Sequence, residues 1–259
     1  MLLIALGLLA AWAQSTEPQQ AGRLFAVIGI STEIAPVEAR LEGATVNRVQ
    51  GVVFTSGMIN GVRIVAVRSG VGKVSAAMAA TLLLDHLSPS AVIFSGTAGA
   101  VDVELEPGDV VIGTGVGYHD YGNVTVDGLV RTPTRDYASG RVDPAFFPAG
   151  PDLLAAARRA AEALKGMRIR EGLIVNGDAF MSSPSRRTEL RRELNAVAVE
   201  MEGASVAQVC LRFGVPIIVI RSITDRADGT ADQSYAKFRD TASRNAADLA
   251  LGTIRELAK

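Results

Sequence analysis

Short apolar runs alternate with longer amphipathic stretches from residue 24 onward. The apolar runs are rich in β-branched residues and have the length of buried strands. They are LFAVIGI (24–30), VRIVAVR (62–68), AVIFS (91–95), DVVIG (109–113) and VPIIVIRSI (215–223). Helical patterns fall at 73–87, 152–164, 184–194, 202–213 and 234–258. This alternation predicts an α/β fold, here a single domain over residues 24–259.

The first residues show a different pattern. MLLIALGLLAAWAQ is an apolar run with the small-x-small triplet Ala11-Trp12-Ala13 near its end, followed by the polar QSTEPQQ. The pattern predicts a signal peptide over residues 1–13, a linker over 14–23 and export, although no Lys or Arg precedes the apolar run. A misassigned start codon would leave a cytoplasmic protein. The run is too short for a stable membrane span.

Composition narrows the set of partners. The 259 residues are 48% hydrophobic and 20% charged, with a formal net charge of -1. A chain of this size and composition can bury one sizeable hydrophobic core. It has no net positive charge that would attract nucleic acid, so nucleic acid is not expected as a partner. The single cysteine, Cys210, falls on an apolar helical face and is expected in the core. His86 and His119 are too few and too far apart for a zinc motif, so no metal is expected.

Glycines mark the ends of three predicted strands. They are Gly29, the pair Gly70 and Gly72, and the pair Gly96 and Gly99. Ligands of open α/β sheets bind beyond the carboxyl ends of strands, where glycine lets backbone amides approach closely. Each turn alone fits an ordinary strand-to-helix connection, but together they predict one pocket.

Carboxylates fall at the same strand ends. Glu33 follows the first strand, Glu200 and Glu202 flank the start of a helix, and Asp225 ends the most apolar strand. Each has a structural alternative, because first-turn acids and N-caps stabilise helices. Their convergence on glycine-lined strand ends favours a functional site.

Five motifs in consistent order resemble one known family. They are SGVGKVSAA (69–77), SGTAGAV (95–101), GDAFMSS (177–183), AVEMEGASVAQVC (198–210) and VIRSITDRAD (219–228). The sequence resembles the 5′-methylthioadenosine/S-adenosylhomocysteine nucleosidases of the nucleoside phosphorylase superfamily over roughly residues 24 to 258. The resemblance implies a three-layer α/β/α sandwich with a central mixed sheet, a small-molecule nucleoside substrate, a homodimer and no cofactor.

The resemblance also implies roles for individual residues. Asp225 would be the general acid that protonates the leaving base, and Glu33 would activate water. Glu202 would accept hydrogen bonds from the ribose hydroxyls while Met201 packs on the sugar. The remaining implied contacts are Phe180 stacking on the base, the main chain of Met181 at its edge, Thr97 and Gly99 beside sugar and base, and Arg221 orienting the acidic groups.

Two other functions stay open. A nucleoside phosphorylase of the same fold would use phosphate in place of water, but Phe94 stands where an anion-binding arginine is expected, and Lys73 is expected to face solvent. A non-catalytic exported nucleoside-binding protein would not need an acid beside the base. Residues 120–151 are dense in Gly, Pro, Asp and Asn, and predict a surface excursion that shapes the pocket for the ribose 5′ group.

Overall fold

The computed structural model describes residues 22–259, so the predicted signal peptide and residues 14–21 of the predicted linker lie outside the described residues. The strands are β1 (Leu24–Gly29), β2 (Glu42–Val49), β3 (Val52–Ile59), β4 (Val62–Arg68), β5 (Ala91–Ala100), β6 (Val110–Tyr118), β7 (Gly122–Thr125), β8 (Gly128–Arg131), β9 (Phe147–Pro148), β10 (Ile169–Asn176), β11 (Ala196–Glu200) and β12 (Ile217–Asp225). The helices are α1 (Ser31–Glu38), α2 (Lys73–Leu87), α3 (Pro151–Ala163), α4 (Pro184–Leu194), α5 (Gly203–Phe213) and α6 (Ala231–Leu257).

A mixed sheet forms the centre of the molecule. Its order is β11-β10-β6-β12-β5-β1-β4-β3-β2, and β9 pairs with β6. The strands β1, β4, β5 and β12 are parallel where they pair, whereas β12 and β6 are antiparallel. The far end of β5 also pairs with β11, at Ala100 and Gly99. This last pairing closes half of the sheet on itself and brings β11 beside the ends of β5 and β12.

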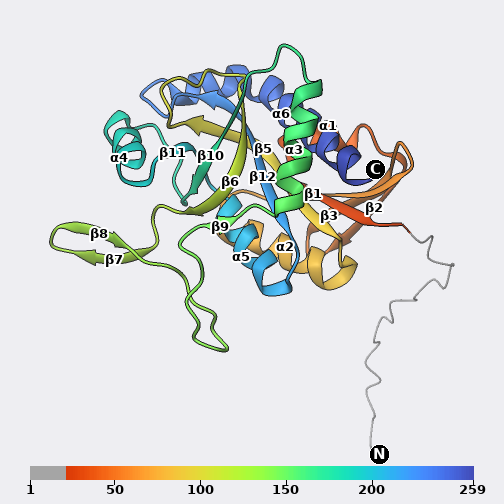
Figure 1. Ribbon diagram of the computed structural model, residues 1–259, viewed down its shortest axis with the longest axis horizontal. Helices are drawn as coiled ribbons and strands as arrows, with labels where there is room; N and C mark the ends of the chain where they lie inside the picture. The colour runs from red at the N-terminus through yellow and green to blue at the C-terminus, as the bar shows by residue number, and fades with distance from the viewer. Residues whose placement is uncertain (1–21) are drawn as a thin grey trace, which may run out of the picture.

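Helices cover both faces of the sheet (Figure 1). In β1, Ala26 and Ile28 pack in one core with α2 and α5, while Phe25 and Val27 pack in a second core with α1, α3 and α6. Successive side chains of a strand point to opposite faces, so a continuously apolar strand can serve two cores at once. The three-layer α/β/α architecture expected from the sequence is confirmed.

The predicted strands and helices are all present, but several elements were not predicted. The hairpin of β2 and β3, the short β11, and β10 were missed, as was α1. Strand β2 is exposed along most of its length, and its sequence, EGATVNRV, lacks the alternation of apolar and polar residues that predicts a half-buried strand. Strand β10 begins with the polar residues of IREG, which mask its buried second half.

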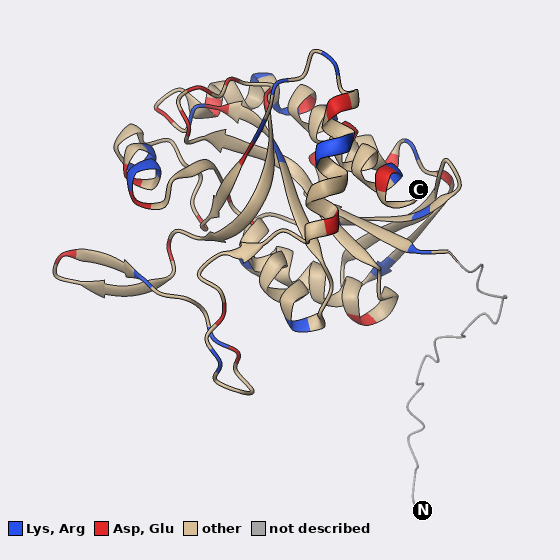
Figure 2. Ribbon diagram, in the orientation of Figure 1, with Lys and Arg blue, Asp and Glu red and all other residues tan. Residues whose placement is uncertain are grey.

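Residues 120–151 are a surface excursion, as predicted. The hairpin of β7 and β8 projects away from the sheet at the left of Figure 1, and β9 then returns the chain to β6. Basic and acidic residues are interspersed over the helices and loops (Figure 2). Among the helices of residues 22–259, none combines the length and the apolar character needed to cross a bilayer.

Candidate active site

A cavity of about 380 Å³ opens where the carboxyl ends of the central strands meet. Its walls come from the ends of β1, β5, β11 and β12, from the loops after β4 and β10, and from the first turns of α6. The segments that glycine marks near the ends of β1, β4 and β5 all reach it, through Ile30, Val71 and Gly99. Gly96 and Gly99 lie inside β5 and not in a turn after it, because this strand runs to Ala100. The expectation that the glycine-marked strand ends build one pocket is confirmed.

Arg221 lies behind the cavity in the middle of β12 and is completely buried. Its guanidinium stacks 4.1 Å from the ring centroid of Phe94. One nitrogen, Nη2, lies 2.5 Å from Glu200 Oε2 and 4.0 Å from Glu202 Oε2. A Cβ on Gly96 would collide with this guanidinium, so β5 needs glycine there. The glycine makes room for a buried positive charge.

Glu200 and Glu202 have different tasks although only Met201 separates them. The Glu200 carboxylate accepts hydrogen bonds from the backbone N–H groups of Glu202 and Gly203, at 2.8–3.1 Å, and so caps the start of α5. The Glu202 carboxylate faces the cavity and accepts from the N–H of Gly72 at 2.8 Å. Burial, followed by the charge of Glu200, raises the pKa of Glu202 to about 7.

Glu33 projects into the same cavity from the first turn of α1. Its Oε1 accepts from Thr97 twice, from the backbone N–H at 3.0 Å and from the hydroxyl at 2.5 Å. Burial raises the pKa of Glu33, while the charge of Arg221 and the Thr97 hydrogen bonds oppose that rise. The carboxyl is thus fixed in one orientation and can hold or release a proton.

Asp225 ends β12 and is almost fully buried. Its Oδ1 accepts from the N–H of Ala227 and its Oδ2 from the hydroxyl of Thr224, both at 2.8 Å. Burial raises the pKa of Asp225 in spite of these two hydrogen bonds. A Cβ on Gly99 would come within 2.8 Å of Asp225 Oδ1, so glycine lets β5 pass close to the carboxylate.

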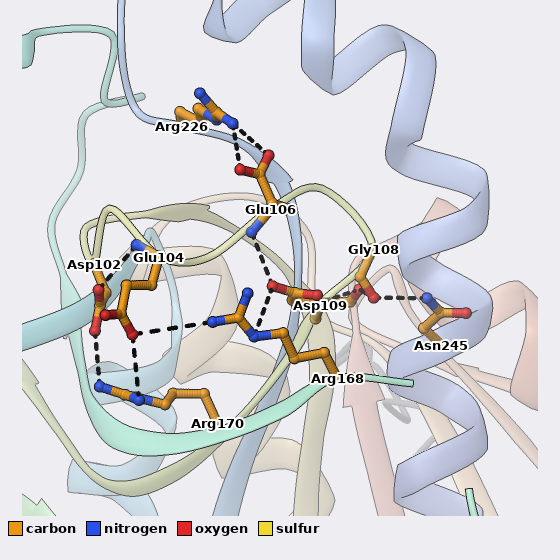
Figure 3. A network of polar contacts seen from close by, with 10 residues as sticks. Asp102, Glu104, Glu106, Gly108, Asp109, Arg168, Arg170, Arg226 and Asn245 are labelled. Atoms are coloured by element: carbon orange, nitrogen blue, oxygen red, sulfur yellow. Dashed lines mark hydrogen bonds and ion pairs between the residues drawn. The ribbon is translucent and has the colours of Figure 1, made fainter. Parts of the chain in front are cut away.

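A polar network outside the cavity links the loop between β5 and β6 to Arg226 and to Asn245 of α6 (Figure 3). Arg226 pairs with both carboxylate oxygens of Glu106. Gly108 lies in the same loop as Glu106, between β5 and β6. Its carbonyl oxygen accepts a hydrogen bond from the side chain of Asn245 of α6 at 2.8 Å, and its N–H donates to the carbonyl oxygen of Ile223. The loop between β5 and β6 thereby ties the end of β12 to α6.

The outer wall of the cavity is apolar and more exposed. Phe180 follows β10 and is 43% exposed, and its ring meets that of Tyr235 from α6 edge-on, with centroids 5.9 Å apart. Met181 and Met201 also line the cavity. Aromatic and thioether side chains around a carboxylate floor suit a flat ligand that carries hydroxyl groups.

Residues 23–255 match the sequence profile of the phosphorylase superfamily. The 5′-methylthioadenosine/S-adenosylhomocysteine nucleosidase of Geobacillus kaustophilus is 40% identical over 233 residues, which are 88% of this chain and 95% of that enzyme. The chain belongs to this nucleosidase family within the phosphorylase superfamily. The nucleosidase of Bacillus velezensis is 37% identical over 90% of this chain and 99% of its own length.

Solved structures of the nucleosidase family have the same fold. The enzyme of Neisseria meningitidis in complex with methylthio-immucillin-A superimposes with a TM-score of 0.81 at 35% identity, over 90% of this chain and 99% of that one. Futalosine hydrolase of Helicobacter pylori is also similar, with a TM-score of 0.79 at 30% identity over 90% and 98%.

The site residues that the nucleosidase resemblance implied come together in this structure. Lining the cavity are Glu33, Thr97, Gly99, Phe180, Met181, Met201, Glu202 and Asp225, with Arg221 directly behind. Phe94 lies in the core beneath the guanidinium, so it offers the cavity neither a hydrogen-bond donor nor a charge. One other expectation was wrong. Lys73 does not simply face solvent, since its Nζ pairs with Asp120 at 2.8 Å.

Several residues of the cavity carry no signal in the sequence that marks them as part of a site. Tyr235 and Asp232 enter from α6, and Val71 from the loop after β4. Tyr235 stands ten residues after Asp225 in a helix whose pattern gives no hint that this turn faces a pocket. Within residues 22–259, no residue of the 120–151 segment lines the cavity, so the expectation that it shapes the pocket is not met within one chain.

Replacing Arg221 with methionine should destabilise the protein strongly. The change leaves the buried carboxylates near it without their counter-charge, a loss of about 3–5 kcal/mol in the free energy of unfolding. Urea unfolding measures it. The matched control is Arg226→Met, because both partners of the Arg226–Glu106 ion pair are about half exposed and its loss should matter far less. Equal losses in the two variants would contradict a central role for the buried charge.

Proposed function

We propose that the protein hydrolyses the N-glycosidic bond of an adenine nucleoside, 5′-methylthioadenosine or S-adenosylhomocysteine, and releases adenine and the free ribose derivative. The main support is that Asp225, Glu33 and Glu202 line one cavity and that the pKa of each carboxyl group is raised. Cleavage of this bond needs a proton for the leaving base, a positioned water and negative charge beside a sugar that becomes cationic. The three carboxyl groups can supply all of these.

Asp225 acts as the general acid in this proposal. Burial raises the pKa of Asp225, so near neutral pH its carboxyl group is protonated in a larger fraction of molecules than the carboxyl group of an exposed aspartate. The hydrogen bond from Ala227 fixes the group in place. Proton transfer to the imidazole-side nitrogen of adenine neutralises the base as it leaves, and such assistance contributes typically about 10²–10⁴-fold in rate.

Glu33 places and deprotonates the attacking water, and Glu202 binds the ribose. The two hydrogen bonds from Thr97 to Oε1 of Glu33 orient the carboxylate in the cavity. Glu202 can accept hydrogen bonds from two adjacent ribose hydroxyls, which are stronger for a charged acceptor than for a neutral one. Met201 packs on the sugar, Phe180 stacks on the base, and the main chain of Met181 contacts its edge.

Phosphate is a poor fit to this cavity, which disfavours the phosphorylase alternative. Its lining within residues 22–259 includes five carboxylates, from Glu33, Glu200, Glu202, Asp225 and Asp232, and no Lys or Arg. Arg221, the cation behind it, already faces Glu200 and Glu202. A phosphate dianion would meet uncompensated negative charge in a partly buried site. A non-catalytic binding protein would not need a buried carboxylic acid such as Asp225 beside the base, which disfavours that alternative.

We further infer that residues 1–13 are a signal peptide that directs export of the protein. If methylthioadenosine is the substrate, the enzyme acts in methionine salvage.

We also infer that the protein is a homodimer, because apolar side chains are exposed at and just before the start of α2. Val71, Val74 and Met78 are 60%, 81% and 43% exposed, and the last two lie four residues apart on one helical face. A second copy of the chain would cover this face beside the cavity mouth.

Purified protein should release adenine from methylthioadenosine in phosphate-depleted buffer. Release is followed from methylthioadenosine, adenosine and inosine, each with and without added phosphate, and the sugar product is identified. We expect the same rate with and without phosphate, and a free sugar. A requirement for phosphate together with a ribose 1-phosphate product would replace hydrolysis with phosphorolysis.

Asp225→Asn should keep the fold and adenine binding but lose turnover. An amide matches the carboxyl group in shape but has no transferable proton, so kcat should fall by at least about 10²-fold. In the wild-type enzyme the acid form is present below the raised pKa, so kcat/KM should decline as pH rises through that pKa; the variant should lack this decline. Steady-state kinetics across pH measures both.

The control is Asp232→Asn, which changes an exposed carboxylate at the mouth of the same cavity. It should retain most of the activity and keep the decline with rising pH, shifted to slightly lower pH because the charge of Asp232 contributes to the raised pKa of Asp225. Turnover of a folded Asp225→Asn protein close to that of this control would disprove the general-acid role.

A further inference from the structure

The loop that carries Phe180 and Met181 is tied to the start of α2 by three charged residues. The Oδ1 atom of Asp178 accepts from the backbone N–H of Lys73 at 2.8 Å. The backbone N–H of Asp178 donates to Oδ2 of Asp120 at 3.0 Å. The Nζ of Lys73 donates to both oxygens of Asp120, at 3.0 and 2.8 Å. Both the side chain and the main chain of Asp178 are therefore held.

The same helix start holds Glu202 at the floor of the cavity. Gly72, the residue before α2, donates its N–H to Glu202 Oε1 at 2.8 Å. Its φ of +84° favours glycine, and a Cβ there would come within 3.2 Å of Asp178 Oδ1. Two successive backbone N–H groups at the positive end of the helix thus bind one carboxylate from each side of the cavity.

Phe180 depends on this attachment for its position. It is 43% exposed and touches Tyr235 edge-on, so the backbone that carries it sets where its ring lies. At the start of the loop, Gly177 donates its N–H to the carbonyl oxygen of Glu200 at 3.1 Å. The loop is therefore fixed first to β11 and then to α2, directly before the residues that line the cavity.

We propose that Lys73, Asp120 and Asp178 are positioning residues that hold the base-binding loop against α2 and so set adenine affinity. This inference rests on the proposed function, in which Phe180 and Met181 contact the base. None of the three touches the reacting atoms. Their side chains are 24%, 30% and 49% exposed, and ion pairs at such exposure stabilise a fold weakly. Their effect should therefore appear in base binding rather than in folding.

The test measures adenine binding and turnover separately in matched variants. Asp178→Ala and Asp120→Ala should each raise the dissociation constant of free adenine and the KM for methylthioadenosine by about tenfold, the loss expected for a partly exposed charge-assisted hydrogen bond. The kcat should stay within about twofold, because a contact made equally in ground and transition states affects KM alone. Calorimetry gives the adenine constants.

Two further variants separate positioning from general damage. Asp120→Asn keeps an oxygen that can accept from the N–H of Asp178, so it should restore most of the adenine affinity that Asp120→Ala loses. Asp127→Ala removes an exposed aspartate of the same segment, in the turn of the β7–β8 hairpin, and should change nothing.

Unchanged adenine constants in both alanine variants would overturn the positioning role. So would a loss of kcat and thermal stability at unchanged KM, which is the signature of a structural residue. If the wild-type protein binds adenine but releases none from nucleosides, the proposed function fails while the adenine constants still decide the positioning role. A wild-type protein that binds no adenine would overturn both.

Discussion

Arg221 carries a positive charge in a place that water does not reach. Such a charge is tolerated only when carboxylates surround it, so its burial dictates where Glu200 and Glu202 must lie. It also requires Gly96 in the neighbouring strand and the flat ring of Phe94 beneath it. The ends of β5, β11 and β12 are brought together by this one requirement, and the cavity lies where they meet.

The same charge divides the carboxyl groups into two kinds. Glu200 is committed to Arg221 and to the start of α5, which leaves it structural. Glu33 and Asp225 are buried with fewer positive partners, and burial raises the pKa of each. At Glu33 the charge of Arg221 and the Thr97 hydrogen bonds oppose the rise in pKa, whereas at Asp225 only the hydrogen bonds from Ala227 and Thr224 oppose it. The two carboxyl groups thus differ in the partners that favour their charged form, as an acid and a base in one cavity require.

The sequence predicted those parts of the molecule that depend on buried periodicity and on strand ends. Asp225 could be placed at this edge because it ends a run too apolar to lie outside the sheet, and Glu202 because it lies at the start of a predicted helix. The exposed β2 could not be predicted, since its polar residues satisfy no pattern. Tyr235 could not be assigned either, because which turn of α6 faces the cavity depends on how the helix packs. The stacking of Phe94 beneath Arg221 could not be predicted either, because sequence position does not show which side chain of a neighbouring strand it meets.

The central claim is that a nucleoside lies with its base against Asp225 and its ribose on Glu202. A crystal structure of the protein with a non-hydrolysable methylthioadenosine analogue tests this most directly. In that complex we expect the Asp225 carboxyl within hydrogen-bond distance of the imidazole-side nitrogen of the base, both ribose hydroxyls on Glu202, and the Phe180 ring stacked on the base. An analogue bound elsewhere, or bound here with its base remote from Asp225, would contradict it.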